Sequence, residues 1–174
     1  MRRLGAATLS TDEVVHELYR SDEVRDLVVE RWGDDVAPGG AVDRSAVAAH
    51  AFATPEDRAW LEGMIWPRVG ERIAAFVAAA RGADPQPRAI VVETPLLFEA
   101  GMEFVYEATI AVIASEELRA QRAQGRGHAA LDERTARQFT QEEKAARATF
   151  TVVNDGSLDD LEAALSEVLV KLGR

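Results

Sequence analysis

A short apolar run that ends at a carboxylate and a proline constrains the fold of this chain most strongly. Residues 89–92 read Ala-Ile-Val-Val, Glu93 follows, and Pro95 stops further strand pairing. Four consecutive apolar residues with β-branched content are typical of a buried strand in a parallel sheet. Ligands collect beyond the carboxyl ends of such strands, so Glu93, Thr94 and Glu99 are expected where chemistry occurs. A buried strand followed by an ordinary polar loop accounts for the same residues equally well.

Apolar strands alternate with amphipathic helices along the rest of the chain. Strands are predicted at about 6–9, 89–93, 108–114 and 150–153. This alternation predicts an α/β fold with a parallel sheet covered by helices on both faces. With 174 residues the chain fits a single domain, 1–174.

The helices between the strands begin at recognisable cap residues. Caps are predicted at Ser21, Asp43, Thr54 (with proline next) and Thr140 (in a capping box with Glu143). A helical region is expected at about 20–80, and its long helix should be interrupted near Pro67. Trp60 and Trp66 on that helix are expected to be core or pocket wall.

Charge and composition exclude several classes of function. The net charge of −10 argues against a general nucleic-acid binder, yet residues 119–147 hold seven basic and four acidic side chains. A local cationic patch on an acidic protein fits a small anionic ligand. The chain has no cysteine, no apolar run of about 18 residues and no export signal, so we expect a cytoplasmic protein without a membrane span. The three histidines lack ligand spacing, and no metal site built from them is expected.

The first residues are typical of the end of a helix. Met1-Arg-Arg-Leu leads to Gly5, a helix terminator, and then directly to a strand. We therefore expect that a strand–loop–helix unit belongs before Met1.

Several motifs, taken in order, resemble the dephospho-CoA kinases, a branch of the P-loop kinases. The matching segments are Leu9-Ser-Thr-Asp12, Val42-Asp-Arg44, Leu61-Glu-Gly-Met-Ile-Trp-Pro67, Pro95-Leu-Leu-Phe-Glu99, Arg122-Ala-Gln-Gly-Arg126, Arg134-Thr-Ala-Arg-Gln138 and Asn154-Asp-Gly-Ser157. Each motif is weak alone, but their order and spacing over residues 3–172 are fairly specific.

The chain departs from the family pattern in four places. The phosphate-binding loop Gly-x-x-x-x-Gly-Lys-Ser/Thr is absent from the sequence. Ser10 stands where the family has a first aspartate, Trp66 where it has a histidine, and Thr149 where it has an aspartate. The resemblance thus implies a P-loop-type three-layer fold whose first strand, phosphate loop and most of whose first helix are missing.

The resemblance also implies a reaction and its residues. Transfer of the ATP γ-phosphoryl group to the ribose 3′-hydroxyl of dephospho-CoA would use Asp12 as the base and Arg126 on the transferring phosphate. The implied acceptor-binding residues are Arg44, Glu93, Pro95, Leu96, Leu97 and Glu99. The implied ATP-binding residues of a lid at about 119–147 are Arg122, Arg134, Arg137 and, after the last strand, Asn154. Mg²⁺ would be held mainly through phosphates, with Glu93 binding through water. We expect no nucleic acid or membrane partner, and a monomer or weak oligomer.

The same residues are also compatible with purely structural contributions. Asp12 can be a plain helix N-cap, Arg44 can form a surface ion pair with Asp43 or a neighbour, and the lid arginines can be solvated salt-bridge partners. The chain as a whole can be another small-molecule kinase of the superfamily, or a non-catalytic relic that binds the coenzyme or a protein.

Overall fold

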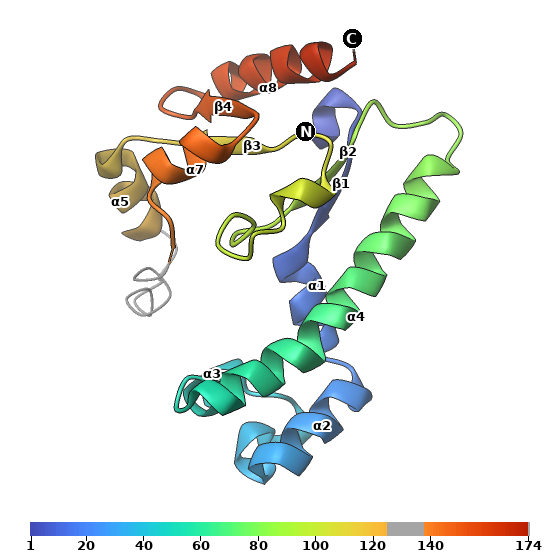
Figure 1. Ribbon diagram of the computed structural model, residues 1–174, viewed down its shortest axis with the longest axis vertical. Coiled ribbons are helices and arrows are strands. Elements are labelled where there is room, and N and C mark those ends of the chain that lie inside the picture. Colours follow the sequence, from blue (N-terminus) through green and yellow to red (C-terminus); the bar gives the residue numbers. More distant parts are fainter. Residues whose placement is uncertain (125–137, 174) are drawn as a thin grey trace. The chain divides into compact units, whose positions relative to one another are not determined.

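The computed structural model describes residues 1–124 and 138–173, which divide into two compact units. The α1–α4 unit is Ala7–Thr94, and the β3–α8 unit combines Met1–Ala6 with Pro95–Arg174. Each unit contains a pair of parallel strands together with helices (Figure 1). The chain therefore has the α/β architecture with parallel strands that its sequence predicts.

The α1–α4 unit contains the apolar strand that ends at Glu93. Its elements are β1 (Ala7–Ser10), α1 (Thr11–Leu18), α2 (Asp22–Trp32), the 3₁₀ helices η2 (Asp34–Val36) and η3 (Pro38–Gly40), α3 (Arg44–Ala51), α4 (Pro55–Arg81) and β2 (Ile90–Glu93). β1 and β2 run parallel, in a register that places Ala7 opposite Ile90 and Ser10 opposite Glu93. The two predicted strands are confirmed to within one residue. Their carboxyl ends bring Ser10 and Glu93 side by side.

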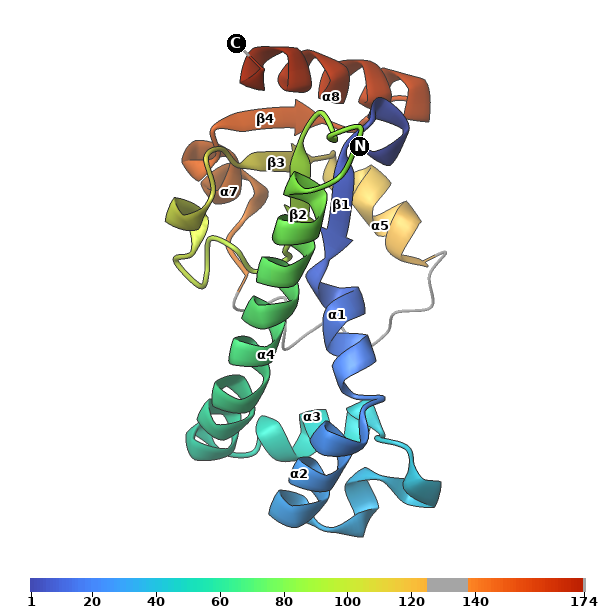
Figure 2. The same ribbon diagram turned by 90° about the vertical axis from the view of Figure 1, so that its right-hand side faces the viewer.

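The core of this unit lies among its helices. Helices α1 and α3 both pack on α4 (Figure 2). The buried cluster consists of Val14, Leu18, Val24, Val28, Val36, Val47, Met64 and Ile65. All residues of β1 are only half-buried, as are Ile90–Val92 of β2. Burial of the helical layer, rather than of the strand pair, therefore supplies most of the hydrophobic stabilisation within this unit.

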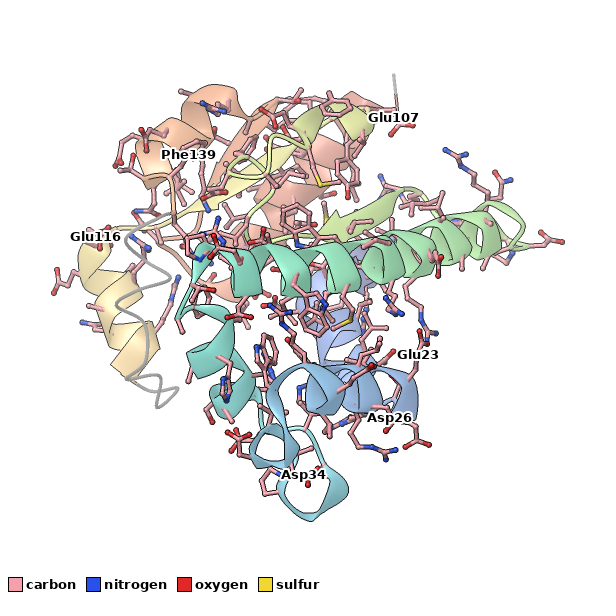
Figure 3. The ribbon with its side chains drawn as sticks, turned by 60° about the horizontal axis from the view of Figure 1, so that its bottom comes forward. Glu23, Asp26, Asp34, Glu107, Glu116 and Phe139 are labelled. Atoms are coloured by element: carbon pink, nitrogen blue, oxygen red, sulfur yellow. The ribbon has the colours of Figure 1, made fainter. Side chains whose placement is uncertain are left out.

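The long helix α4 corrects two expectations. It runs without interruption through Pro67, so the predicted break is wrong. An interior proline costs a helix about 3 kcal/mol, but α4 is held on both sides of it, by buried Ile65 before and by Arg68 after. The Arg68 guanidinium donates to the Met64 carbonyl and pairs with Glu23 on α2, the residue that is labelled in Figure 3. Trp66 is 56% exposed, so of the two expectations for it, core or pocket wall, the first is wrong.

The predicted helix starts are confirmed by their cap hydrogen bonds. The Ser21 hydroxyl accepts from Val24 N–H at 3.3 Å, and the Asp43 carboxylate accepts from Ser45 N–H at 2.8 Å. Thr54 accepts from Asp57 N–H at 3.0 Å, with Pro55 in the first turn. These bonds satisfy backbone donors that the first helical turn leaves without partners.

Asp57 joins the end of α2 to the start of α4. Its carboxylate accepts from Arg31 Nη2 at 2.8 Å, from Trp32 Nε1 at 3.2 Å and from the Thr54 hydroxyl at 2.9 Å. The Trp32 indole in turn meets Trp60 edge to face, with ring centroids 5.0 Å apart. The hydrogen bond from Arg31, supported by those from Thr54 and Trp32, holds the pKa of Asp57 below its ordinary value.

Acid should therefore weaken this unit through Asp57. A carboxylate with a lowered folded-state pKa stabilises the fold at pH values above its unfolded pKa, near 4, and this stabilisation is lost as the pH falls through the folded value. We expect Asp57→Asn to lower the urea midpoint clearly at pH 7 and by less at pH 3, where part of this stabilisation is lost. Asp22→Asn, which removes an exposed partner of Arg25 on α2, is the control. Equal losses for Asp57→Asn at both pH values would contradict the assignment.

The β3–α8 unit begins and ends with helical turns. Its elements are η1 (Arg2–Leu4), η4 (Glu103–Val105), β3 (Ile110–Ile113), α5 (Glu116–Gln124), α7 (Gln141–Arg147), β4 (Phe150–Val153) and α8 (Leu158–Leu172). Gly5 has φ 83° and ψ 16° and donates to the Arg2 carbonyl, so the predicted glycine terminator is confirmed. Thr140 and Glu143 form the predicted capping box at α7.

The second unit, like the first, contains one pair of parallel strands. β3 and β4 run parallel with Ile110 opposite Phe150 and Ile113 opposite Val153. Val112 and Val153 of this pair are exposed. None of the helices in the described part of the chain combines the length and apolarity required to cross a membrane.

Candidate active site

A hydroxyl and two carboxylates gather at the carboxyl edge of the β1–β2 pair. The Ser10 hydroxyl donates to Glu93 Oε2 at 2.6 Å across the two strand ends. Asp12 follows as the second residue of α1 and is exposed. The N-cap of α1 is Ser10, so the reading of Asp12 as a plain N-cap is wrong. Asp12 instead presents a solvent-facing carboxylate in the first helical turn, where the helix dipole favours negative charge.

Arg44 lies beside the same helix. Its Nη1 is 3.1 Å from His16 Nδ1, and His16 comes one helical turn after Asp12 on α1. The carboxylate of Asp43 is engaged in capping α3 through Ser45. The contact thus places a permanent cation against α1, on the face that also carries Asp12.

The polar side chains at this edge are of the types that bind an alcohol and an anion. An exposed carboxylate at a strand end can accept a hydroxyl proton, and an arginine can bind a phosphate with its planar fork. The oxygens of Glu93 and Ser10 are ligand types that Mg²⁺ accepts. Among the described residues no group of three or more acidic or histidine side chains could hold a metal by itself.

In the β3–α8 unit, the predicted acceptor-binding residues Pro95–Glu99 form a tight turn. Ala100 N–H donates to the Leu96 carbonyl at 3.0 Å, and Met102 N–H donates to the Leu97 carbonyl at 3.1 Å. Phe98 is buried and anchors the turn, while Leu96 is 48% exposed. The turn therefore exposes the apolar side chain of Leu96 to solvent, while its backbone is held by these hydrogen bonds and by the buried Phe98.

The carboxylate of Glu99 is bound by protein groups of this same unit. Its Oε1 lies 2.9 Å from Lys144 Nζ and accepts from Phe139 N–H at 2.8 Å. Burial alone would raise the pKa of Glu99, but the hydrogen bonds from Lys144 and Phe139 and the Lys144 charge hold it below its ordinary value. This placement favours a structural contribution of Glu99 over the direct acceptor contact predicted from the motif.

Sequence reasoning missed Lys144 as a functional candidate. Its ammonium also donates to the Pro95 carbonyl at 3.0 Å, so it contacts both ends of the Pro95–Glu99 turn. The pairing joins residues more than forty positions apart, which no local spacing predicts. One signal was present: the chain has 20 basic residues, and only two of them, Lys144 and Lys171, are lysines.

The structure brings together two of the predicted ATP-binding residues. Arg122 Nη1 on α5 donates to the Asn154 carbonyl at 2.9 Å, just after β4. Asn154 N–H continues the strand by donating to the Ile113 carbonyl at 2.7 Å, and the Asp155 carboxylate accepts from Ser115 N–H at 2.7 Å. The predicted lid residues Arg126, Arg134 and Arg137 lie outside the described residues.

Comparison with known proteins agrees with the motif order. The dephospho-CoA kinase family model matches residues 1–160. A dephospho-CoA kinase of Deinococcus radiodurans is 35% identical over 99% of this chain and 83% of its own length. The dephospho-CoA kinase of Thermus thermophilus is 34% identical over 99% of this chain and 82% of its own length.

Two solved structures share the fold. A crystal structure of a Thermus thermophilus protein superimposes with a TM-score of 0.78 at 33% identity, and it covers 98% of this chain and 87% of its own. A dephospho-CoA kinase from Campylobacter jejuni has a TM-score of 0.64 at 23% identity, over 99% of this chain and 87% of its own, which supports the fold alone. By its family match and by these relatives, the chain belongs to the dephospho-CoA kinase family.

Proposed function

We propose that this chain supplies the acceptor-binding machinery of a dephospho-CoA kinase, and that its substrates are dephospho-CoA and ATP. The observation that carries the proposal is the polar edge of the β1–β2 pair. There Asp12 is exposed at the start of α1, Ser10 pairs with Glu93, and Arg44 lies against the same helix. Membership in the dephospho-CoA kinase family supports assigning this edge to the phosphorylation of dephospho-CoA.

The proposed step is an in-line phosphoryl transfer. The ribose 3′-oxygen of dephospho-CoA attacks the γ-phosphorus of ATP, the bond from that phosphorus to the β–γ bridging oxygen breaks, and ADP leaves. Asp12 orients the hydroxyl and accepts its proton, while Arg44 binds negative charge on the acceptor. Mg²⁺, when bound to the ATP phosphates, would neutralise charge that develops on the leaving group, with Glu93 as an outer ligand through water.

We assign the ATP side to residues near β3 and β4. Arg122 and Asn154 are in contact there, and Arg126, Arg134 and Arg137 complete the set by their place in the sequence motifs. Arg126 is the residue proposed to stabilise charge on the transferring phosphoryl group.

We also propose that the phosphate-binding loop comes from a polypeptide segment outside residues 1–174. The sequence contains no Gly-x-x-x-x-Gly-Lys-Ser/Thr. The exposure of the strand residues also supports the proposal. Parallel strands are normally buried within larger sheets, whereas the residues of β1 and β2 are half-buried or exposed. A cytoplasmic location, a monomeric or weakly associated state and the absence of nucleic-acid and membrane partners remain part of the same proposal.

The chain should bind dephospho-CoA in the absence of ATP. By isothermal titration calorimetry we expect saturable binding, and we expect Arg44→Ala to weaken it by about tenfold or more, as loss of a charge-assisted hydrogen bond does. Arg25→Ala is the matched control, because Arg25 is bound to Asp22 and Asp26 on α2. Absence of saturable binding by the parent chain, or equal effects of the two substitutions, would contradict the assigned acceptor site.

A further inference from the structure

Lys144 on helix α7 forms a half-buried ion pair with Glu99 at the end of the Pro95–Glu99 turn. The Lys144 side chain is 22% exposed and that of Glu99 is 11% exposed, and their charged groups meet at 2.9 Å. The same ammonium donates to the Pro95 carbonyl at 3.0 Å. One side chain thus binds the first and the last residue of a five-residue turn.

The rest of α7 is fixed to the same unit at two further points. The Gln141 amide accepts from Ala114 N–H and donates to the Ala114 carbonyl, both at 2.8 Å, where β3 ends. The Arg147 guanidinium lies 4.4 Å from the ring centroid of Phe139, the residue that is labelled in Figure 3. Because these contacts hold α7 in place, the backbone of Lys144 is also held in place. The hydrogen bonds of its side chain can therefore position the turn.

The residue type at position 144 matches this geometry. Of the 20 basic residues of the chain, 18 are arginines, yet a lysine occupies this site. A compact ammonium with three rotatable donors can reach a carboxylate and a carbonyl in different directions, whereas the planar guanidinium fork suits a single flat partner. The second Glu99 oxygen is buried without a hydrogen-bond partner. Removing this ion pair from water therefore costs desolvation free energy. Neutralising the charge of Glu99 would not require the further hydrogen bond from Lys144 to the Pro95 carbonyl.

We infer that Lys144 is a positioning residue for the acceptor, because it holds the Pro95 carbonyl and the Glu99 carboxylate and so fixes Leu96 and Leu97. The inference rests on the proposed function for the identity of the ligand. Leu96 is the exposed side chain of the turn, and buried Phe98 secures its other side. An apolar group held in this way is suited to contact a non-charged part of dephospho-CoA. In this inference Lys144 acts on the turn through Pro95 and Glu99, and the proposed transfer step assigns it no proton or phosphate.

Three variants separate positioning from charge balance. Lys144→Met leaves Glu99 buried without its cation and is expected to lower the thermal midpoint. The double variant Glu99→Gln with Lys144→Met removes both charges and is expected to regain most of that midpoint. Lys171→Met, which replaces the other lysine of the chain at an exposed position in α8, is the matched control.

The deciding measurements are the dissociation constant for dephospho-CoA and amide hydrogen exchange in the turn. In the double variant we expect binding at least tenfold weaker, and exchange at least tenfold faster at Ala100 and Met102, whose N–H groups close the turn. Lys171→Met should change neither. Unchanged exchange, or full affinity in the double variant, would overturn the inference. Failure of the parent chain to bind dephospho-CoA would overturn the proposed function instead, and the exchange result would still decide whether Lys144 positions the turn.

Discussion

Residues 1–174 alone should form CoA and ADP at less than about 10⁻⁴ of the rate of the same chain preceded by a strand, a Gly-x-x-x-x-Gly-Lys-Ser/Thr loop and a helix. The loop's consecutive backbone N–H groups and its lysine hold the β- and γ-phosphates of ATP. Removing a single donor of this kind typically costs a factor of about 10²–10³ in rate. A chain without the loop lacks several donors and the lysine together, so we expect its rate to fall by more than the loss of one donor would cause.

The measurement is dephospho-CoA-dependent ADP release by the two chains at matched concentration. Binding of dephospho-CoA by the 174-residue chain is the control that its acceptor edge is folded. Turnover on the order of 1 s⁻¹, as is usual for kinases, by residues 1–174 alone would show that the phosphates are held by other groups. If the extended chain also stays inactive while both chains bind dephospho-CoA, the alternative of a non-catalytic binding protein is supported.

Local structure could be predicted from the sequence because its causes are local. The caps at Ser21, Asp43 and Thr54 each place a side-chain oxygen within three residues of the N–H it accepts. Gly5 reaches positive φ where other residues are strained. The strands were found from short apolar runs with β-branched residues.

The errors came from contacts between distant residues. The break predicted at Pro67 fails because α4 is held by the buried cluster and by the Arg68–Glu23 pair from α2. Trp66 is apolar by type but occupies an outward position on that helix. Strand pairing is likewise non-local, so the sequence pattern predicted the strands but not the register in which they pair.

In the candidate site, too, local features could be predicted from the sequence and contacts between distant residues could not. The polar residues at the carboxyl ends of β1 and β2 follow from the parallel-sheet rule, and the register confirms that Ser10 and Glu93 are neighbours. The contact of Arg44 with His16 and the ion pair of Lys144 with Glu99 depend on how helices pack, so local sequence patterns do not predict them. Motif comparison therefore found Glu99 but attributed to it a direct contact with the acceptor, whereas the structure shows it paired inside the unit.

Asp12→Asn should have the second large effect, on turnover and not on acceptor affinity. In the chain extended with a phosphate-binding loop, we expect kcat to fall by about 10²–10⁴, the range lost when a general base is removed. Asparagine keeps the size and hydrogen-bonding reach of the side chain but cannot take the 3′-hydroxyl proton. The dissociation constant for dephospho-CoA should change by less than about threefold, because Arg44 carries the charged contact in the proposed site.

Glu13→Gln is the matched control for this substitution. Glu13 is adjacent to Asp12, lies in the same first turn of α1 and is also exposed. Both substitutions remove one negative charge from the helix N-terminus, so their effects on helix stability should be similar and small. A fall in kcat confined to Asp12→Asn would then be due to proton transfer and orientation of the hydroxyl. If both variants lose the same activity, or Asp12→Asn retains full turnover, the base must be another group, and Glu93 at the neighbouring strand end would be the next residue to replace.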